Sequence, residues 1–142
     1  VPTVDALAYN CFGTDRVICP IMDARRNQVY AGLYMFEGDR FITLREQAVF
    51  AVDELVRCVN DLQRPVIFLG DGVPVYQKQI ENMVTVSYSL APAHTARQRA
   101  GAVGALAQIY YEQGKFCSAE EHVPVYLRLS QAERERKEAL EK

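Results

Sequence analysis

Two apolar segments joined by a short polar turn constrain the fold of this chain more than any other feature. The segments cover residues 17–22 and 29–36, and Asp23-Ala24-Arg25-Arg26-Asn27-Gln28 lies between them. Runs of β-branched and aromatic residues separated by a polar turn are typical of a β-hairpin. The turn places an acid, Asp23, and a guanidinium, Arg25, where a buried strand meets solvent. We therefore interpret it as a candidate phosphate-binding or partner-contact loop.

The composition fits one domain or a large part of one. The chain has 142 residues, of which 49% are hydrophobic and 24% are charged, as in ordinary globular proteins. Its net charge of −2 gives no electrostatic reason to expect nucleic-acid binding by this chain alone. The cysteines form no Cys-x-x-Cys pair, which argues against a metal site and favours reduced thiols in a cytoplasmic protein. They are Cys11, Cys19, Cys58 and Cys117.

The residue patterns predict one helix, then three strands, then alternating helices and strands. Thr3 is suited to cap a first helix that ends near Asn10. Because the chain enters this helix at once, we interpret it as a fragment whose N-terminal part is absent. Strands are expected at 16–22, 28–36, 40–50, 66–69 and 84–88, and further helices at 53–62, 74–82 and 93–113.

Individual residues predict further details of these strands and helices. Pro20 cannot donate a ladder hydrogen bond, which predicts an edge position or a local bulge for the first strand. Gly114 is placed to end the long helix. Tyr30, Tyr34 and Tyr126 are expected at the edge of the core. The small residues of the long helix predict close packing against a sheet or another helix; they are Ala100, Gly101, Ala102, Gly104, Ala105 and Ala107.

The order of elements after the first helix, β-β-β-α-β-α-β-α, is the ribonuclease-H-like order. It predicts an α/β fold with a mixed five-stranded sheet and helices on both faces. Right-handed crossovers would make the later strands parallel to the first. Residues 131–142 are highly charged and are expected to form a mobile or peripherally packed tail.

Two acids are candidates for a chemical site. Asp23 ends the first strand and Asp71 follows the fourth, and in this topology the two strands are neighbours. A two-metal nuclease needs several carboxylates around divalent cations, and Glu54 could be a third. The chain offers no convincing fourth, and acids at loop edges are common in any soluble protein. This interpretation is therefore the weaker one.

A second interpretation is nucleotide binding at Gly70-Asp71-Gly72. Glycines let a backbone approach a ligand closely, and the following helix offers N-terminal N–H groups. A tight strand-to-helix turn explains the same residues more simply. Likewise, Arg25 and Arg26 could clamp an anion or could merely be polar turn residues. The histidines, His94 and His122, lie near no obvious nucleophile, so protease activity is poorly supported.

Several segments taken together resemble the TsaB (YeaZ) family. Residues 1–8, VPTVDALA, resemble its "V-x-T-L-x-A-L-A" helix, and residues 23–30, DARRNQVY, resemble its "D-A-R-x-x-E-V-Y" hairpin. Gly70-Asp71-Gly72 followed by Tyr76 is similar to its "G-x-G" turn. Residues 124–128, PVYLR, resemble its "P-x-Y-L-R" ending. These segments occur in the family's order, but Gln28 stands where the family often has an acid.

The resemblance implies a lobe of the actin/Hsp70/sugar-kinase superfamily. Residues 1–12 would lead in from a missing N-terminal lobe, and residues 13–130 would form the C-terminal lobe. Such proteins are non-catalytic partners of TsaD and TsaE in forming threonylcarbamoyl-adenosine in tRNA, and older names call them glycoprotease-like. The partner surface would lie mostly in the missing lobe, and tRNA would be contacted only indirectly. The alternative is a phosphotransferase or nucleotide hydrolase.

The resemblance also implies what the candidate site would bind. No cofactor is expected in the fragment, whereas ATP or ADP is compatible with the full-length complex. The candidate half of an inter-lobe nucleotide cleft consists of Asp23, Arg25, Gly70, Asp71 and Gly72. A paired-histidine metal motif, as in the catalytic relative, is missing from this sequence.

Overall fold

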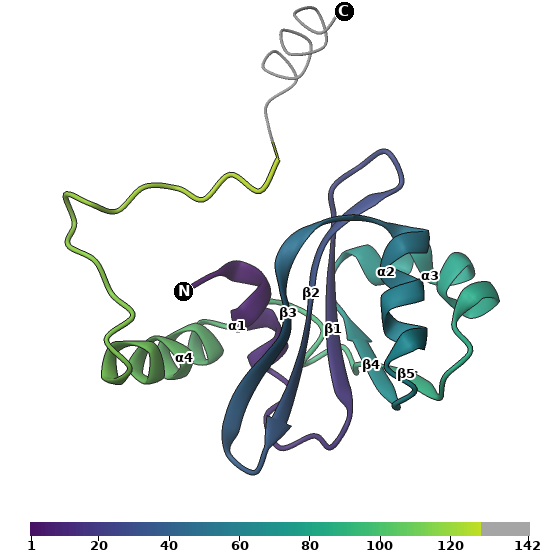
Figure 1. Ribbon diagram of the computed structural model, residues 1–142, viewed down its shortest axis with the longest axis horizontal. Helices are drawn as coiled ribbons and strands as arrows, with labels where there is room; N and C mark the ends of the chain where they lie inside the picture. The colour runs from purple at the N-terminus through teal and green to yellow at the C-terminus, as the bar shows by residue number, and fades with distance from the viewer. Residues whose placement is uncertain (129–142) are drawn as a thin grey trace, which may run out of the picture.

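A mixed five-stranded sheet forms the centre of the computed structural model, which describes residues 1–128 (Figure 1). Hairpins join β1 (Val17–Asp23), β2 (Gln28–Glu37) and β3 (Arg40–Ala51) into an antiparallel unit. β4 (Val66–Leu69) and β5 (Tyr88–Leu90) run parallel to β1, and the strand order is β3-β2-β1-β4-β5. The predicted α/β fold and its parallel later strands are confirmed.

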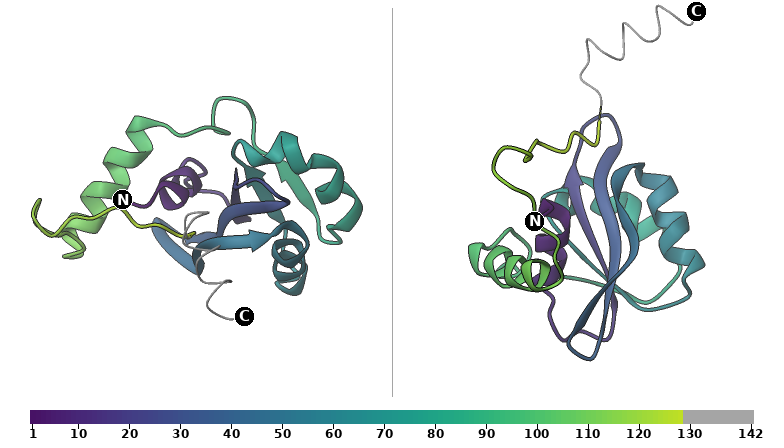
Figure 2. Two further views of the ribbon diagram at one scale, coloured as in Figure 1. Left: turned by 90° about the horizontal axis from the view of Figure 1, so that it is seen from above. Right: turned by 60° about the vertical axis from the view of Figure 1, so that its left-hand side comes forward.

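Helices cover both faces of the sheet, as predicted. α2 (Val52–Asp61) and α3 (Gly72–Met83) lie on one face, and α1 (Thr3–Tyr9) and α4 (Ala100–Glu112) lie on the other (Figures 1 and 2). Each face has its own apolar core, because the central strands bury both of their faces. The largest fully buried side chains come from both cores and include Tyr34, Phe68, Leu7, Ile18 and Leu55.

Pro20 lies neither on an edge strand nor at a bulge of its own strand, the two positions that were predicted. β1 is the central strand, between β2 and β4. In the pairing of β1 with β2, Ile18 pairs with Tyr34 and the next pair is formed by Ile21. Pro20, which has no N–H, lies in the unpaired stretch between them. The register shifts lie one strand away, between β2 and β3 around residues 31–34. The bulge therefore belongs to the neighbouring pair of strands.

Two elements begin later in the chain than predicted. β5 begins at Tyr88 rather than at Val84, and α4 begins at Ala100 rather than at Ala93. Residues 91–99 form a loop, and some of its carbonyl groups accept hydrogen bonds from residues distant in sequence. The Asn10 side chain donates to the carbonyls of residues 95 and 97, and the N–H of Gly70 donates to that of residue 96. Those carbonyls are not free for helical bonds.

The predicted N-cap of α1 is wrong, whereas the predicted end of α4 is correct. Pro2, not Thr3, occupies the N-cap of α1, and its carbonyl accepts the N–H of Ala6. Gly114 does end α4, with a φ of 72°. Its N–H donates to Tyr111 O, and the next N–H, of residue 115, donates to the carbonyl of residue 110. This pair of bonds is a Schellman motif, which satisfies carbonyls that the helix end leaves free.

Much of α4 is exposed, contrary to the prediction of close packing. Leu106 is its buried residue, and nothing lies within 4 Å of a Cβ placed on Gly101 or Gly104. Tyr126 is also wrongly predicted, because it is 84% exposed, whereas Tyr34 is buried and Tyr30 is half-buried. The side of the molecule that carries α4 is thus the less densely packed one.

The cysteines are all free, as predicted for reduced thiols. Burial, and secondly the nearby Cys58, raises the pKa of Cys19, and burial raises that of Cys11 to about 11. Within residues 1–128, none of the helices has the length and apolar character needed to cross a membrane. The prediction of a mobile tail at residues 131–142 lies outside the described residues.

Candidate functional site

The turn after β1 and the turn after β4 meet at one end of the sheet. β1 and β4 are paired in parallel, so their carboxyl ends lie side by side. An Asp71 carboxylate oxygen accepts the backbone N–H of Asp23 at 3.3 Å. The structure therefore brings together the two acids that the topology predicted to be neighbours.

Protein donors already occupy the carboxylate of Asp23. Its Oδ1 accepts the backbone N–H of Arg25 at 2.8 Å and the hydroxyl of Tyr76 at 2.9 Å, and the Arg25 guanidinium lies 3.6 Å from Oδ2. The Arg25 N–H contributes most to lowering the pKa of Asp23, and the Tyr76 bond and the guanidinium add to it. Burial, followed by the bond to Asp23, raises the pKa of Tyr76. Asp23 is thus an ionised anchor for the hairpin.

The hairpin turn has an unusual backbone. Arg25, Arg26 and Asn27 all have positive φ, of 64°, 55° and 58°. This left-handed region costs an L-residue about 1–2 kcal/mol, and arginine has no special preference for it. Backbone bonds close the turn, because Ala24 N–H donates to Gln28 O and Gln28 N–H donates to Arg25 O, each at 3.0 Å.

The Gly70-Asp71-Gly72 turn packs against β1. Gly70 has a φ of 109°, and a Cβ added to it would collide with the carbonyl of Ile21. A Cβ on Gly72 would come within 3.0 Å of the same oxygen. At the start of α3, Val73 N–H donates to Gly70 O, and Pro74 has no N–H. The glycines serve a tight strand-to-helix turn, and the helix offers few free donors for a phosphate.

A cavity of about 340 Å³ lies beside this turn, at the carboxyl ends of β4 and β5. Its lining is mostly apolar and includes Phe68, Gly70, Leu90 and Pro74. Arg97 supplies a cation. Open α/β sheets bind ligands at this kind of position. Of the predicted site residues, Gly70 alone lines this cavity.

A second cavity, of about 440 Å³, lies on the opposite, α1-bearing face of the sheet. The N-terminal residues 1–4 line one side, together with Met22, Tyr30 and Gln47, and residues 122–128 line the other. The latter segment is held at its end by Arg128, whose Nη1 donates to the carbonyl of Ala24 at 2.6 Å.

Sequence reasoning missed several residues that the fold places at these turns. Arg97 was predicted to lie inside a helix, and Arg128 reaches the hairpin from 104 residues away. Tyr76 was noted only as part of a motif. Its spacing of one helical turn from Gly72 was the available signal for a side chain directed at Asp23.

The arrangement does not favour a two-metal site. Glu54, the suggested third acid, lies 3.7 Å from the Arg45 guanidinium. Among residues 1–128, no three His, Cys, Asp or Glu side chains come together in a way that could hold a metal ion. His122 lies 3.8 Å from the Cys117 sulfur in an exposed loop.

Comparison with known proteins gives a consistent result. A model of the family described as "TsaD: tRNA N6-adenosine threonylcarbamoyltransferase" matches residues 1–136. The tRNA threonylcarbamoyladenosine biosynthesis protein TsaB of Bacillus subtilis (strain 168) is 34% identical over 136 residues. That match covers 94% of this chain and 56% of the relative, so the chain spans just over half of the relative's length.

Solved structures show the same fold. YeaZ from Pseudomonas aeruginosa matches with a TM-score of 0.66 and 20% identity, over 89% of this chain and 58% of that one. A Pseudomonas aeruginosa protein described as similar to peptidase YEAZ matches with a TM-score of 0.62 and 18% identity, over 90% and 57% of the two chains. The family model and the match to Bacillus subtilis TsaB both extend over nearly the whole of this sequence, so this chain belongs to the TsaB (YeaZ) family.

Proposed function

We propose that this chain is the C-terminal lobe of a non-catalytic TsaB-type subunit in the complex that forms threonylcarbamoyl-adenosine in tRNA. The name of the Bacillus subtilis relative and the description of the family model both support this pathway. In the proposal, residues 1–12 lead in from an N-terminal lobe and residues 13–130 form the C-terminal lobe. TsaD supplies the transferase chemistry and TsaE the ATPase, in the cytoplasm.

The observation that carries the proposal is the use of the two central acids as structural anchors. The Asp23 carboxylate accepts bonds from Arg25 and Tyr76, and an oxygen of Asp71 accepts the N–H of Asp23. A catalytic carboxylate directs an oxygen at a reacting group or a metal, and among residues 1–128 no three His, Cys, Asp or Glu side chains come together to hold a metal ion. These bonds instead hold the hairpin, β1 and α3 together, as a scaffold requires.

Exposed apolar side chains on the α4 side support a role in protein contacts. Tyr111 on α4 is 67% exposed, and Phe116, Val125 and Tyr126 in the segment that follows are 66–84% exposed. The rings of Tyr111 and Phe116 stack with their centroids 5.0 Å apart, and exposed apolar side chains that adjoin one another commonly mark an interaction site. We assign this side to contacts inside the full-length subunit, with the N-terminal lobe as its occupant. The surface for TsaD then lies mostly on that lobe.

The cavity beside Gly70 supports a nucleotide role that depends on the rest of the subunit. Its mostly apolar lining and single cation, Arg97, would provide at most half of an inter-lobe cleft for ATP or ADP. The same cavity would be used by the runner-up function, a phosphotransferase or nucleotide hydrolase. The two functions differ in whether this subunit turns nucleotide over by itself.

Calorimetric titration separates these functions. ATP with Mg²⁺ is titrated into the full-length protein alone, into TsaD alone and into their mixture, and phosphate release is followed in parallel. We expect no ATP turnover by this protein alone. Tight, Mg²⁺-dependent binding with turnover by this protein alone would overturn the scaffold proposal. Arg97→Gln tests use of the cavity, and Arg40→Gln, at the far end of the sheet, is the matched control.

A further inference from the structure

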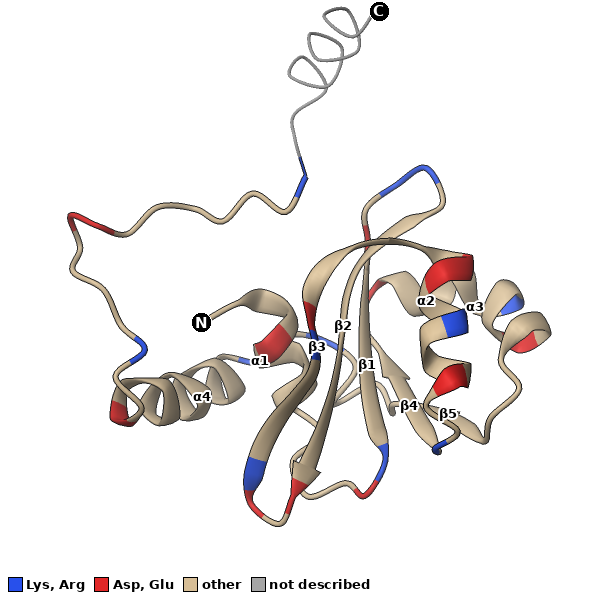
Figure 3. Ribbon diagram, in the orientation of Figure 1, with Lys and Arg blue, Asp and Glu red and all other residues tan. Residues whose placement is uncertain are grey.

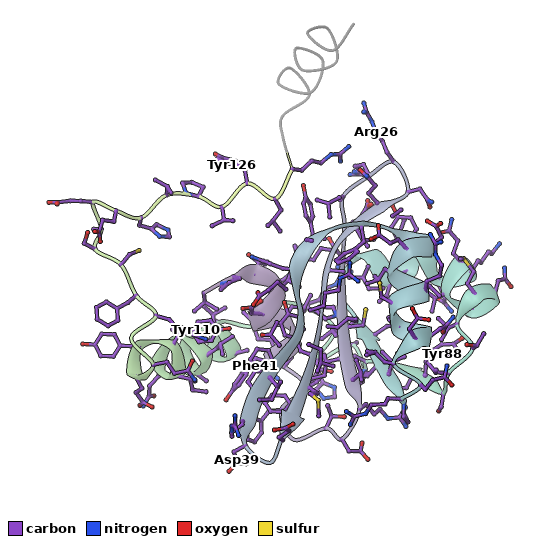
Figure 4. The ribbon with its side chains drawn as sticks, in the orientation of Figure 1. Arg26, Asp39, Phe41, Tyr88, Tyr110 and Tyr126 are labelled. Atoms are coloured by element: carbon purple, nitrogen blue, oxygen red, sulfur yellow. The ribbon has the colours of Figure 1, made fainter. Side chains whose placement is uncertain are left out.

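Three arginines gather at the β1–β2 turn, and we call Arg25, Arg26 and Arg128 the arginine tip. The Arg25 side chain is 87% exposed, and Arg26 points away from the body of the molecule (Figure 4). Arg128 joins them through its 2.6 Å bond to the Ala24 carbonyl. In Figure 3, the blue that marks Lys and Arg lies at the end of this hairpin and at the end of the segment that reaches it. Two distant parts of the chain therefore converge on one basic projection.

The backbone beneath the tip is fixed by contacts from three sides. Asn27 O accepts the N–H of Val52 from α2 at 3.2 Å, and Asn27 Oδ1 accepts an N–H from Gln79 of α3 at 3.0 Å. The Arg25 N–H is held by Asp23. Three successive left-handed residues persist only where the surroundings determine them in this way. The side chains of Arg25 and Arg26 thus start from a preorganised base, which lowers the entropic cost of binding.

Neighbouring acids leave the outer surface of the tip cationic. Asp23 has a side chain only 15% exposed and lies on the inner side, against Arg25. At the adjacent start of α2, Asp53 lies 3.2 Å from the Arg57 guanidinium, and Glu54 is paired with Arg45. Among the described residues, Arg26 and Arg128 have no recorded ion pair with an acid.

The composition of the hairpin part of the tip favours a polyanion over a protein surface. Residues 23–28 contribute no exposed large hydrophobic side chain, and Ala24 is buried. Beside Arg128, the exposed Val125 and Tyr126 belong to the segment that we assign above to contacts with the N-terminal lobe. Protein interfaces have an apolar core, whereas nucleic-acid interfaces are more polar and more basic. Arginine forks match phosphate oxygens in a bidentate way.

We propose that the arginine tip binds the phosphate backbone of the tRNA that the complex modifies. This inference rests on the proposed function and goes beyond it, because that function requires only indirect contact with tRNA. The contact is to phosphates, so it positions the tRNA without reading its sequence.

The test uses the full-length protein assembled with TsaD, and measures tRNA affinity over a series of salt concentrations. Arg26→Asn removes the charge with a residue that tolerates positive φ, and Arg26→Lys keeps the charge. Arg40→Gln, at the opposite end of the sheet, is the control. We expect Arg26→Asn to reduce the salt slope by about 1, so that the wild type loses about three- to fourfold more affinity between 50 and 200 mM salt. Arg26→Lys should retain most of the slope.

The outcomes separate this inference from the proposed function. Unchanged affinity and slope for Arg26→Asn, in a complex that assembles and modifies tRNA, would overturn the inference alone. Loss of TsaD binding with unchanged tRNA affinity would show that the tip contacts protein, and would also overturn it. Failure of the wild-type protein to support modification would overturn the proposed function. An equal loss of affinity for unrelated tRNAs would support the phosphate contact.

Discussion

Asp5 is a buried carboxylate that joins three elements. It is 5% exposed, and its two oxygens accept the hydroxyls of Tyr34 from β2 and Tyr110 from α4, each at 2.7 Å. Burial, followed by the bond to Asp5, raises the pKa of both tyrosines. Since α4 has one buried side chain, Leu106, this polar bridge is a main attachment of α4 to the rest of the fold.

Removing one hydroxyl of this bridge should be costly. Tyr34→Phe leaves the buried carboxylate with one donor fewer, so we expect the free energy of unfolding to fall by about 1–3 kcal/mol. Tyr110→Phe should cost less, because Tyr110 is only half-buried. Urea denaturation of the two variants measures both effects. Equal stability of Tyr34→Phe and the wild type would show that the bridge contributes nothing.

The lowered pKa of Asp23 predicts a pH dependence of stability. A carboxyl whose pKa is lower in the folded state contributes stability that is present above its unfolded pKa, about 3.8. This contribution is lost as the pH falls through the folded value. The difference in the free energy of unfolding between the wild type and Asp23→Asn should therefore shrink below about pH 4. A difference that stays constant from pH 3 to pH 7 would contradict the anchoring role.

At the scale of the elements, the turn between β4 and α3 sets how closely α3 approaches β1. Gly70→Ala introduces a Cβ at a φ of 109°, against the Ile21 carbonyl. We expect a loss of about 3 kcal/mol or more, or failure to fold. Gly38→Ala is the matched control, because Gly38 has a φ of 60° with nothing within 4 Å, and it should lose only about 1–2 kcal/mol. Similar melting temperatures for the two variants would refute the close approach.

The sequence predicts the existence and order of the elements well, because each depends on a local pattern. The apolar runs of β1, β2 and β4 and the apolar face of α2 are all found close to their predicted positions. The starts of β5 and α4 are both displaced, and for α4 a partner distant in sequence is the cause. Asn10, at the end of α1, bonds to carbonyls in residues 91–99 and holds that segment out of the helix.

The candidate site is only partly predictable from the sequence. The meeting of Asp23 and Asp71 follows from strands β1 and β4 being neighbours, which the order of elements implies. The roles of Tyr76 and Arg128 depend on the position of α3 and on the path of residues 113–128 around the N-terminus (Figure 1). No local pattern encodes that path.

At the scale of the whole molecule, the two faces of the sheet are unequal. The face under α2 and α3 encloses a continuous core, whereas the α1 and α4 side exposes apolar groups and borders a cavity of about 440 Å³. The chain also spans just over half of its Bacillus subtilis relative. Both features fit the proposal that a further lobe completes this side.

Formation of threonylcarbamoyl-adenosine by a reconstituted complex tests this account most directly. The full-length protein is combined with TsaD, TsaE, tRNA, ATP and the threonylcarbamoyl donor, and the modified nucleoside is quantified by mass spectrometry. We predict that omitting this protein reduces the product to background, and that the protein by itself forms no product. Undiminished product without this protein, or product formed by this protein alone, would contradict the account.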